Sequence, residues 1–434
     1  MDKLLPNLYA EYGKYINKYR AFPSILDGTK MVERRLLYSL YEVARERLVK
    51  SAKVVGHCIG HYHPHGDTSA YQSLVGIVQN GFAVGQGNWG ADIGVEALPA
   101  AAQRYTEVRF SKEMLELAFE YIKSVPYAEV EMDNEPIFIP TKIPLCLLGN
   151  SYCQGMGFGY RTLIPCYTKA DLLKRLEWIL SDKTTNGPII KPISDCKILS
   201  GDVEYSQLLT SGKAKLEFQG KYKKDGANSV VIESLPPSRS FQALFTKFNK
   251  EITVDKSLGW QDESKTSTKV RLTIIKPRML KMSDLEKKLK TVMTGSVTFE
   301  CHVCNVQGKV TLLSIDDMLL NVYKVYKQVV GKVLQKQSID IQIHIDELNL
   351  IELIKPLLSL ELKANPDDLT LVIANISAPL KQSEEVIKGI FDKYTLSRIF
   401  RIKTDTVQLL QQKQIIDANH ADLTNYIWKE KYSK

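Results

Sequence analysis

The sequence has few of the residues that build a disulfide-stapled domain or a closed metal site. Only seven of its 434 residues are cysteines, and they are scattered without a disulfide framework, which indicates a reducing compartment. Cys301 and Cys304 have no second pair to complete a metal clip, so we expect both to be buried strand residues. The seven histidines include no HExxH motif. We therefore expect no metal held by this chain alone.

Membrane and targeting signals are also missing. No apolar run reaches the length of a membrane span, and the residues after Met1 do not resemble a signal peptide. We therefore expect a soluble protein of the cytoplasm, or of the host cell cytoplasm if the chain is viral, with no membrane partner.

The charge balance gives a modest preference for a polyanionic partner. Lys plus Arg number 58 against 49 Asp plus Glu, so the net charge is +9 and the pI is about 8.9. Such a balance favours nucleic acid as a partner, although an excess of this size supports DNA binding without requiring it. The length of the chain leaves room for two or three domains.

The most informative stretch is Arg104-Tyr105, within residues 100–107. A free tyrosine has a pKa of about 10, so it is a poor nucleophile at neutral pH unless nearby positive charge stabilises the phenolate. Arg104 carries such a charge permanently, and its guanidinium can also bind phosphate oxygens. Tyr105 is therefore a candidate for attack on a DNA phosphodiester. The alternative is a half-buried tyrosine beside a surface arginine.

Further motifs lie upstream in a fixed order, in residues 20–23, 27–35, 50–56, 60–67 and 85–90. They spell RAFP, DGTK followed by two arginines, KSAKVVG, GHYHPHGD and GQGNWG. In order and spacing these strings resemble the DNA-cleavage subunit of type IIA DNA topoisomerases, the family of gyrase A and the A subunit of topoisomerase IV. The resemblance is dense from residue 20 to about residue 110 and looser beyond it.

This resemblance implies an ATP-dependent isomerase that breaks both strands of double-stranded DNA and passes a second duplex through the break, for relaxation or decatenation. Tyr105 would become joined to the 5′ end of a cut strand, while Arg104 would stabilise the charge building on the phosphate. Two copies would form a homodimer with one tyrosine for each strand. In size the chain looks most like the medium subunit of T-even bacteriophage topoisomerase, and a shortened bacterial topoisomerase IV subunit is the alternative.

Cofactor signatures are missing from the chain itself. There is no Walker A loop and no Asp-x-Asp cluster of the kind that holds catalytic magnesium. The resemblance therefore implies that ATP is bound, and Mg²⁺ mainly held, by a partner subunit of the ATPase/TOPRIM type, in a heterotetramer.

The resemblance also assigns site residues. Beside Tyr105 and Arg104, the predicted catalytic residues are Arg20 and His65, which match phosphate-contacting positions. The predicted DNA contacts are Lys30, Arg34, Arg35, Lys53, His63 and Met156. Met156 matches an aliphatic residue that wedges between base pairs and bends the duplex. Its alternative is a mobile glycine-rich turn with one buried methionine.

Several positions depart from the family pattern. Glu33 stands where histidine is common, Met31 where proline is usual and His61 where lysine is usual, so we expect a weaker grip on phosphate there. Thr68 and Gln72 replace the serine and acidic residue that bacterial enzymes often present to the water-metal bridge of quinolones. We expect weak quinolone poisoning, which efficient trapping of cleavage complexes at low drug concentration would contradict.

Four histidines crowd one loop: His57, His61, His63 and His65. A zinc site is one interpretation, but the loop lacks the Cys or His partners of a closed site. Protonatable imidazoles also bind phosphate, which agrees with the resemblance. The third interpretation is that the rings simply pack the loop.

The predicted fold is α+β and multidomain. Residues 1–145 would form a winged-helix DNA-cleavage domain with the catalytic tyrosine, residues 146–310 a tower domain, and residues 311–434 an antiparallel coiled coil with a C-gate dimerisation tip. Alternating segments at 213–218 and 229–233 predict strands. Five lysines there could extend a track for DNA, or could be a solvated face: Lys213, Lys215, Lys221, Lys223 and Lys224.

Helical periodicity locates the DNA-cleavage helices. One helix is predicted over 31–48, with an apolar face that leaves Arg34 and Arg35 for solvent or phosphate. A second is predicted from an Asp67 cap through Gln79, with Tyr71, Leu74, Val75 and Val78 at helical spacing. Such a pair suggests a helix-turn-helix unit.

The C-terminal third changes to coiled-coil spacing. Ser314 would cap a helix with a stripe of Ile315, Leu319, Val322, Tyr326, Val329 and Val333. A matching stripe in the closing helix is Ile402, Leu409, Ile416 and Leu423. Between them we expect a compact helical piece punctuated by Pro356, Pro366 and Pro379.

Two rivals remain. One is a DNA-binding scaffold of the same fold that has lost the chemistry, against which the intact Arg104-Tyr105 pair argues. The other is a tyrosine recombinase, which would need two further arginines and a histidine in a helical domain, without a coiled-coil tail. Changes of linking number in steps of two would favour duplex passage over both.

Overall fold

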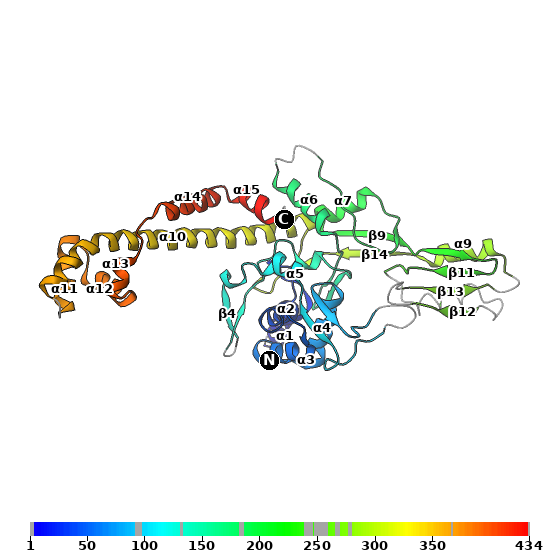
Figure 1. The fold of residues 1–434 in the computed structure, drawn as a ribbon. Helices are drawn as coiled ribbons and strands as arrows, with labels where there is room; N and C mark the ends of the chain where they lie inside the picture. The colour runs from blue at the N-terminus through cyan, green and yellow to red at the C-terminus, as the bar shows by residue number, and fades with distance from the viewer. Residues whose placement is uncertain are drawn as a thin grey trace. The chain divides into compact units, whose positions relative to one another are not determined.

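The computed structural model describes residues 4–91, 98–130, 133–181, 186–237, 246, 259–264, 270–276, 280–365 and 368–432. Within these ranges the chain combines helices, one of them very long, with small antiparallel sheets (Figure 1). The predicted mixture of helix and strand is confirmed. The chain divides into two compact units, Met1–Tyr326 and Lys327–Lys434. None of the described helices is long and apolar enough to cross a membrane.

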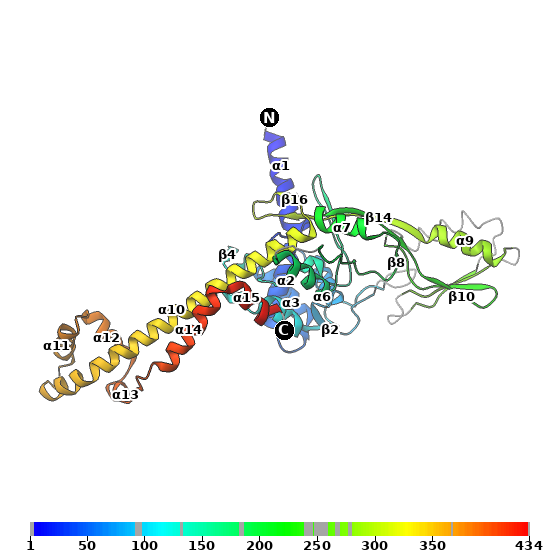
Figure 2. The same ribbon diagram turned by 90° about the horizontal axis from the view of Figure 1, so that it is seen from above.

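The first unit begins with a group of helices. They are α1 (Leu4–Ile16), the short π-helix η1 (Asn17–Ala21), α2 (Met31–Val43), α3 (Ser51–His61) and α4 (Asp67–Gln79). α2, α3 and α4 pack on one another around buried side chains that include Leu36, Leu40, Val54, Cys58 and Leu74. Figure 2 shows α1 leading away from this bundle.

The first predicted helix ends earlier than expected, at Val43 rather than residue 48. Ala44 leaves the helical conformation, and its carbonyl accepts a hydrogen bond from the Phe110 N–H at 2.8 Å. A neighbouring strand therefore takes the acceptor that the next helical turn would have used. This tertiary contact is invisible to helical periodicity.

The predicted second helix is α4, and the predicted cap was wrong. Gly66 takes the cap position and Asp67 is the first helical residue, so the Asp67 side chain does not cap the helix. The fully buried face is Ala70, Leu74 and Ile77, with Tyr71 only partly buried. α3 was not predicted, although Val54, Val55 and Cys58 give it a buried face at helical spacing.

A small sheet contains the strand that follows Tyr105 in the chain. Its strand order is β1-β3-β2, with β1 (Val49–Lys50), β3 (Glu107–Phe110) and β2 (Ala83–Gln86) all antiparallel. Tyr105 lies in the connection that enters β3. The sheet thus fixes one end of the segment that carries the candidate nucleophile.

Short elements continue the first unit. They are α5 (Lys112–Met114), η2 (Leu115–Phe119), η3 (Ile122–Ser124), the hairpin β4 (Tyr127–Val130) and β5 (Asp133–Pro136), and η4 (Leu145–Leu147). β5 lies against α2, so its side chains can reach the helical bundle.

A five-stranded sheet has the order β6-β7-β14-β9-β8. Its strands are β6 (Cys153–Met156), β7 (Arg161–Ile164), β14 (Thr294–Glu300), β9 (Lys213–Gln219) and β8 (Lys197–Ile198), accompanied by α6 (Lys169–Leu180) and α7 (Asp202–Ser211). A four-stranded sheet, β10-β11-β13-β12, joins β10 (Tyr222–Asp225), β11 (Ser229–Ile232), β13 (Leu272–Ile275) and β12 (Gly259–Asp262). It shares an apolar core with α9 (Met282–Val292).

The strands predicted at 213–218 and 229–233 are confirmed as β9 and β11. β9 alternates as its sequence suggests, with Ala214, Leu216 and Phe218 buried and the lysines outside. The last hairpin of this unit pairs β15 (His302–Cys304) with β16 (Val310–Leu312). Cys301 and Cys304 are both buried as predicted, Cys304 in β15 and Cys301 between β14 and β15.

The long helix α10 runs from Ile315 to Ala364. Ser314 precedes it as predicted, and its Oγ accepts a hydrogen bond from the Asp317 N–H at 2.9 Å. The predicted stripe is buried from Ile315 through Val329, while Val333 is partly exposed. Pro356 lies inside the helix instead of ending it.

The second unit pairs α10 with the closing helices α14 (Val407–Ala421) and α15 (Leu423–Ile427), followed by η5 (Trp428–Tyr432). Lys327 Nζ donates to Thr424 Oγ1 at 2.6 Å, and Ser338 Oγ donates to Asp417 Oδ1 at 2.5 Å. The two contacts run in opposite directions along the chain, so the helices are antiparallel (Figures 1 and 2). One continuous closing helix was expected, but it is interrupted at Asp422.

A compact helical piece lies between these helices in sequence. It comprises α11 (Leu369–Leu380), α12 (Glu384–Lys393) and α13 (Leu396–Arg401), which share a core with the end of α10. Pro379 lies inside α11, and Pro366 is outside the described residues. Ile402, assigned above to the closing stripe, packs against this core instead.

Candidate active site

Tyr105 lies at the surface, and the guanidinium of Arg104 lies over the face of its ring. The residue is 65% exposed, and Arg104 Cζ lies 4.7 Å from the centroid of its ring. A guanidinium over an aromatic face is attracted by the negative face of the ring. The predicted nucleophile is thus accessible, and a permanent cation accompanies it.

Buried hydroxyl groups anchor the chain next to Tyr105. Thr106 is fully buried, and its Oγ1 lies 2.8 Å from Ser51 Oγ and 2.9 Å from the Tyr71 hydroxyl. The Tyr71 hydroxyl donates to the Ala101 carbonyl at 2.6 Å, and the Ser51 N–H donates to the Thr106 carbonyl at 3.0 Å. The first residue of α3 and the first turns of α4 therefore anchor the chain segment that carries Tyr105. Sequence analysis missed this role of Ser51 and Tyr71.

The glycine-rich segment 85–90 passes under the same loop. The Ala101 N–H donates to the Asn88 carbonyl at 2.9 Å. Gly87 has a φ of 101°, and a Cβ there would lie 3.2 Å from the Tyr105 carbonyl oxygen. Only glycine takes this backbone conformation without strain. The close approach of the Tyr105 carbonyl also leaves little room for a side chain at this position.

A hydrogen bond joins the tyrosine loop to the histidine loop. Gln103 Nε2 donates to Asp67 Oδ2 at 2.8 Å, at the start of α4 and two residues after His65. The predicted nucleophile and the predicted phosphate-binding histidines therefore belong to adjoining loops on one part of the first unit.

His63 is buried against Arg35 and is held in its neutral form. Arg35 Nη1 lies 3.2 Å from His63 Nδ1. Burial, followed by the positive charges of Arg35, His65 and Arg20, lowers the pKa of His63 to about 4. The ring of His65 meets that of His63 edge to face, with centroids 4.5 Å apart, and His65 is only partly buried. The loop combines a neutral inner imidazole with an outer imidazole that solvent can reach.

The expectation that Arg34 and Arg35 face solvent or phosphate was wrong about their exposure. Both are buried, Arg34 Nε at 2.9 Å from Asp27 Oδ2 and Arg35 Nε at 2.6 Å from Glu135 Oε2. A buried cation needs a buried anion, and these carboxylates satisfy both guanidinium groups inside the fold. The predicted DNA contacts by these two arginines stay predictions.

The remaining predicted cations lie at the surface. Arg20 is exposed on η1 and close enough to His63 for its charge to lower the pKa of that ring. Lys53 is exposed on α3 and forms no ion pair with any described residue. Lys30 is partly exposed, and its Nζ donates to the Gln154 carbonyl at 2.6 Å, which ties the start of α2 to β6. The structure thus gathers Arg20 and the two histidines, with Lys30 beside β6.

Met156 ends β6 and is 83% exposed, so the alternative of a buried methionine is wrong. Its glycine neighbours are required by packing against η1. A Cβ at Gly155 would lie 1.9 Å from the Ala21 carbonyl oxygen, and one at Gly157 would lie 2.2 Å from Asn17 Oδ1. The hairpin therefore rests on the helix that carries Arg20, and it presents an apolar side chain outward.

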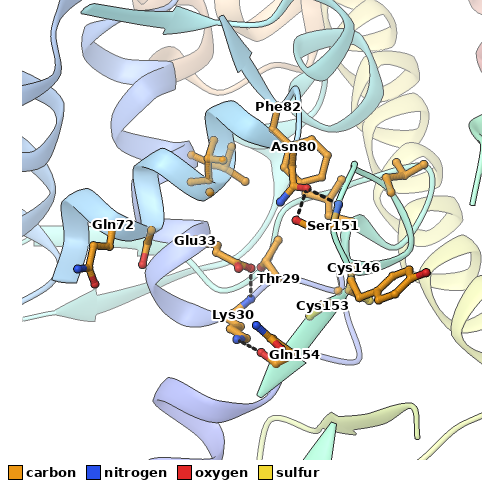
Figure 3. A pocket seen from close by; sticks show the side chains of 18 residues that line it. Thr29, Lys30, Glu33, Gln72, Asn80, Phe82, Cys146, Ser151, Cys153 and Gln154 are labelled. Carbon is orange, nitrogen blue, oxygen red and sulfur yellow. Dashed lines mark hydrogen bonds between the residues drawn. The ribbon is translucent and has the colours of Figure 1, made fainter. Parts of the chain in front are cut away.

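A cavity of about 390 Å³ lies beside the predicted contacts, between the start of α2, α4 and β6 (Figure 3). Its lining includes Lys30, Glu33, Gln72 and Cys153. Glu33 Oε2 accepts a hydrogen bond from the Lys30 N–H at 2.9 Å (Figure 3). A carboxylate in the first turn also suits the positive end of a helix. Glu33 is thus explained locally as a stabiliser of α2.

The predicted lysine track, which runs from β9 in the five-stranded sheet to β10 in the four-stranded sheet, is partly neutralised. Ion pairs join Lys213 to Glu300 at 2.7 Å, Lys223 to Glu233 at 2.5 Å and Lys224 to Glu286 at 3.0 Å. Lys215 and Lys221 are exposed without an ion pair to any described residue. The solvated-face interpretation accounts for the paired lysines.

Metal ligands do not gather in the part of the chain that the structure describes. No group of three or more His, Cys, Asp or Glu side chains is arranged there to hold a metal ion. His57 and His61 instead lie near carboxylates, with His57 Nε2 3.8 Å from Glu42 Oε2 and His61 Nδ1 3.0 Å from Asp133 Oδ2. The donor set does not fit a magnesium or zinc site within these residues.

Comparison with known proteins shows extended similarity to one family. The family model for the A subunit of DNA gyrase/topoisomerase IV matches residues 20–432. The DNA gyrase A subunit of Campylobacter jejuni is 31% identical over 54% of this chain and 29% of that protein. The DNA topoisomerase 4 A subunit is 29% identical in Salmonella typhimurium, over 74% of this chain and 45% of that protein. In Escherichia coli K12 it is 31% identical, over 63% and 39%. The chain spans less than half the length of these relatives.

Proposed function

Since the chain belongs to the family of the DNA gyrase/topoisomerase IV A subunits, we propose that it is the DNA-cleavage and religation subunit of an ATP-dependent type IIA DNA topoisomerase. The observation that carries the proposal is the exposed Tyr105, set under Arg104 on a loop that buried hydroxyl groups anchor. Accessible position, adjacent cation and fixed backbone are what a tyrosine nucleophile needs.

In the proposed reaction, Tyr105 loses its phenolic proton and its oxygen attacks a DNA phosphorus. The bond from phosphorus to the 3′ oxygen breaks, and that oxygen takes up a proton and leaves as a 3′ hydroxyl. The 5′ end remains esterified to Tyr105. Arg104 stabilises both the phenolate and the charge on the five-coordinate phosphorus. Religation is the reverse reaction, which needs no new energy because the ester bond is conserved.

The residues predicted to contact DNA have different roles in this proposal. Arg20 and His65 bind the phosphate backbone next to the cut, while Lys30 and Lys53 grip it further along. Met156, with its side chain in solvent, enters the base stack and kinks the duplex. The relaxation and decatenation activities follow when a second duplex passes through the break.

We propose the following domain roles. Residues 1–145, with α2, α3, α4 and the β1-β3-β2 sheet, form a winged-helix cleavage domain, and residues 146–310 form a tower domain that supports the arms of the DNA. Residues 311–434, with the antiparallel α10 and α14, form a coiled coil whose helical tip pairs with a second copy as the C-gate. Two tyrosines then face the two strands.

A partner subunit completes the enzyme in this proposal. ATP is bound, and Mg²⁺ mainly held, by a polypeptide of the ATPase/TOPRIM type. The complex is a heterotetramer on double-stranded DNA. It works in the cytoplasm, that of the host if the source is a bacteriophage.

The chemistry is tested by stopping cleavage reactions with detergent and separating the products on denaturing gels. Wild-type protein with its partner, ATP and magnesium should yield broken plasmid whose ends are shifted until protease is added. Tyr105→Phe should yield none, whereas the exposed Tyr160→Phe should behave as wild type. Attachment that persists in Tyr105→Phe would refute the assignment.

Duplex passage is tested separately on supercoiled plasmid. Changes of linking number in steps of two support the proposed enzyme. Steps of one or site-specific recombinant products would instead favour a recombinase, and DNA binding without any adduct would favour a scaffold.

A further inference from the structure

Strand β5 supplies carboxylates to the helical bundle from outside the sequence motifs. Asp133 and Glu135 are two residues apart, so they point to the same face of the strand. Asp133 contacts His61 at the end of α3, and Glu135 contacts Arg35 in α2. The strand therefore contacts both α3, which precedes the loop with His63 and His65, and α2.

Glu135 holds Arg35 by two hydrogen bonds, one to each carboxylate oxygen. Arg35 Nε donates to Oε2 at 2.6 Å and Nη2 donates to Oε1 at 2.9 Å. This paired arrangement fixes the plane of the guanidinium and leaves Nη1 as the donor toward His63 Nδ1, at 3.2 Å. Since Glu135, Arg35 and His63 are all buried, water does not compete for these contacts.

The contact with Arg35 decides which nitrogen of His63 carries the proton. A guanidinium has donors only, so His63 Nδ1 must accept and the ring proton must sit on Nε2. The ring of His63 also contacts the ring of His65, edge to face. The outer histidine thus packs against the ring that Arg35 contacts.

We propose that Glu135 is a positioning residue that orients the His63–His65 pair through Arg35. Glu135 touches neither the nucleophile nor DNA in this role. Its effect on cleavage rests on the proposed function above, whereas its effect on His63 does not. Without the carboxylate, Arg35 loses its fixed plane and His63 loses its directed donor.

The imidazole of His63 gives a direct readout. We would record ¹⁵N chemical shifts of histidine-labelled full-length protein at pH 7.5, with the His63 signals identified by their loss in His63→Gln. The wild type should show one fixed Nε2–H tautomer. Glu135→Gln should move both nitrogen shifts toward the averaged values of a free neutral imidazole.

Matched variants separate positioning from folding. Asp133→Asn alters an exposed pair on the same strand and should leave the His63 shifts unchanged. If Glu135→Gln fails to fold, the double variant Arg35→Met with Glu135→Leu removes both buried charges together, which proteins tolerate better than a single buried charge. It should give the same averaged shifts.

Cleavage in the presence of the partner provides the second readout. Glu135→Gln should form the covalent adduct about 10- to 100-fold more slowly at saturating DNA, as expected when reacting groups are displaced, with DNA affinity within twofold of wild type. Asp133→Asn should cleave within twofold of wild type. Unchanged His63 shifts in Glu135→Gln, or in the double variant, overturn the inference. Absence of any adduct in the wild type refutes the proposed function and leaves the result on His63 standing.

Discussion

Replacing Thr106 with valine tests whether hydroxyl groups hold the tyrosine loop. Valine keeps the shape of threonine but exchanges Oγ1 for a methyl group, so contacts of 2.8 and 2.9 Å to Ser51 and Tyr71 are lost. Thr106 and Ser51 are fully buried, so bulk water does not replace the hydrogen bond between them. Each lost hydrogen bond costs about 0.5–1.5 kcal/mol, so we expect the free energy of unfolding to fall by about 1–3 kcal/mol.

Thr106→Val should lower the rate of DNA cleavage more than its effect on folding suggests, because Thr106 directly follows Tyr105 in the chain. A displacement of reacting atoms by about 1 Å can cost roughly 100-fold in rate. We therefore expect the covalent adduct to form about 10- to 100-fold more slowly at saturating DNA. DNA affinity should stay near that of wild type, since the exposed cations are untouched. Urea unfolding and a time course on denaturing gels measure the two effects.

Thr141→Val is the matched control. Thr141 is also buried, and its hydroxyl donates to the Ile143 carbonyl at 2.7 Å, within its own loop. We expect this variant to lose stability but to cleave DNA like wild type. If Thr106→Val also cleaves at the wild-type rate, the hydroxyl cluster does not position the tyrosine and the argument fails.

Three further predictions concern buried and surface charge. Asp27→Asn should lower the free energy of unfolding by about 3–5 kcal/mol, because it leaves the buried Arg34 cation without its carboxylate, and an unchanged urea midpoint would contradict this. Because the folded-state pKa of His63 is about 4, the unfolded chain binds an extra proton between about pH 6.5 and 4, so stability should fall as the pH falls through that window. His63→Gln should flatten that part of a series of urea unfolding curves. Glu33→Gln removes a negative charge beside Lys30 but keeps an acceptor for its N–H, so fluorescence anisotropy should show DNA binding a few-fold tighter at low salt, with the difference fading as salt is added.

Local patterns in the sequence predicted much of the scaffold. The alternation in β9, the start of α4 near residue 67 and the Ser314 cap of α10 each depend on residues close in sequence. Their period and capping chemistry are therefore readable without the fold. The exposed Tyr105 beside Arg104 was likewise found from two adjacent residues.

Long-range contacts account for what the sequence did not reveal. Arg35 looked like a surface cation because its carboxylate, Glu135, lies a hundred residues away in a strand with no recognisable motif. The early end of α2 has the same origin, because a carbonyl of Ala44 is taken by a strand residue, Phe110. Pairings of this kind depend on topology, which one sequence does not encode locally.

The anchoring of the tyrosine loop also bears on how tightly DNA could bind. Ordering one residue of a flexible backbone costs about 1–2 kcal/mol of conformational entropy. In this protein the backbone around Thr106 is already ordered by Ser51, Tyr71 and Asn88 in the free chain. If DNA binds as proposed, it meets a loop whose backbone is already ordered beside Tyr105, and the free energy of its contacts remains available for deforming the duplex.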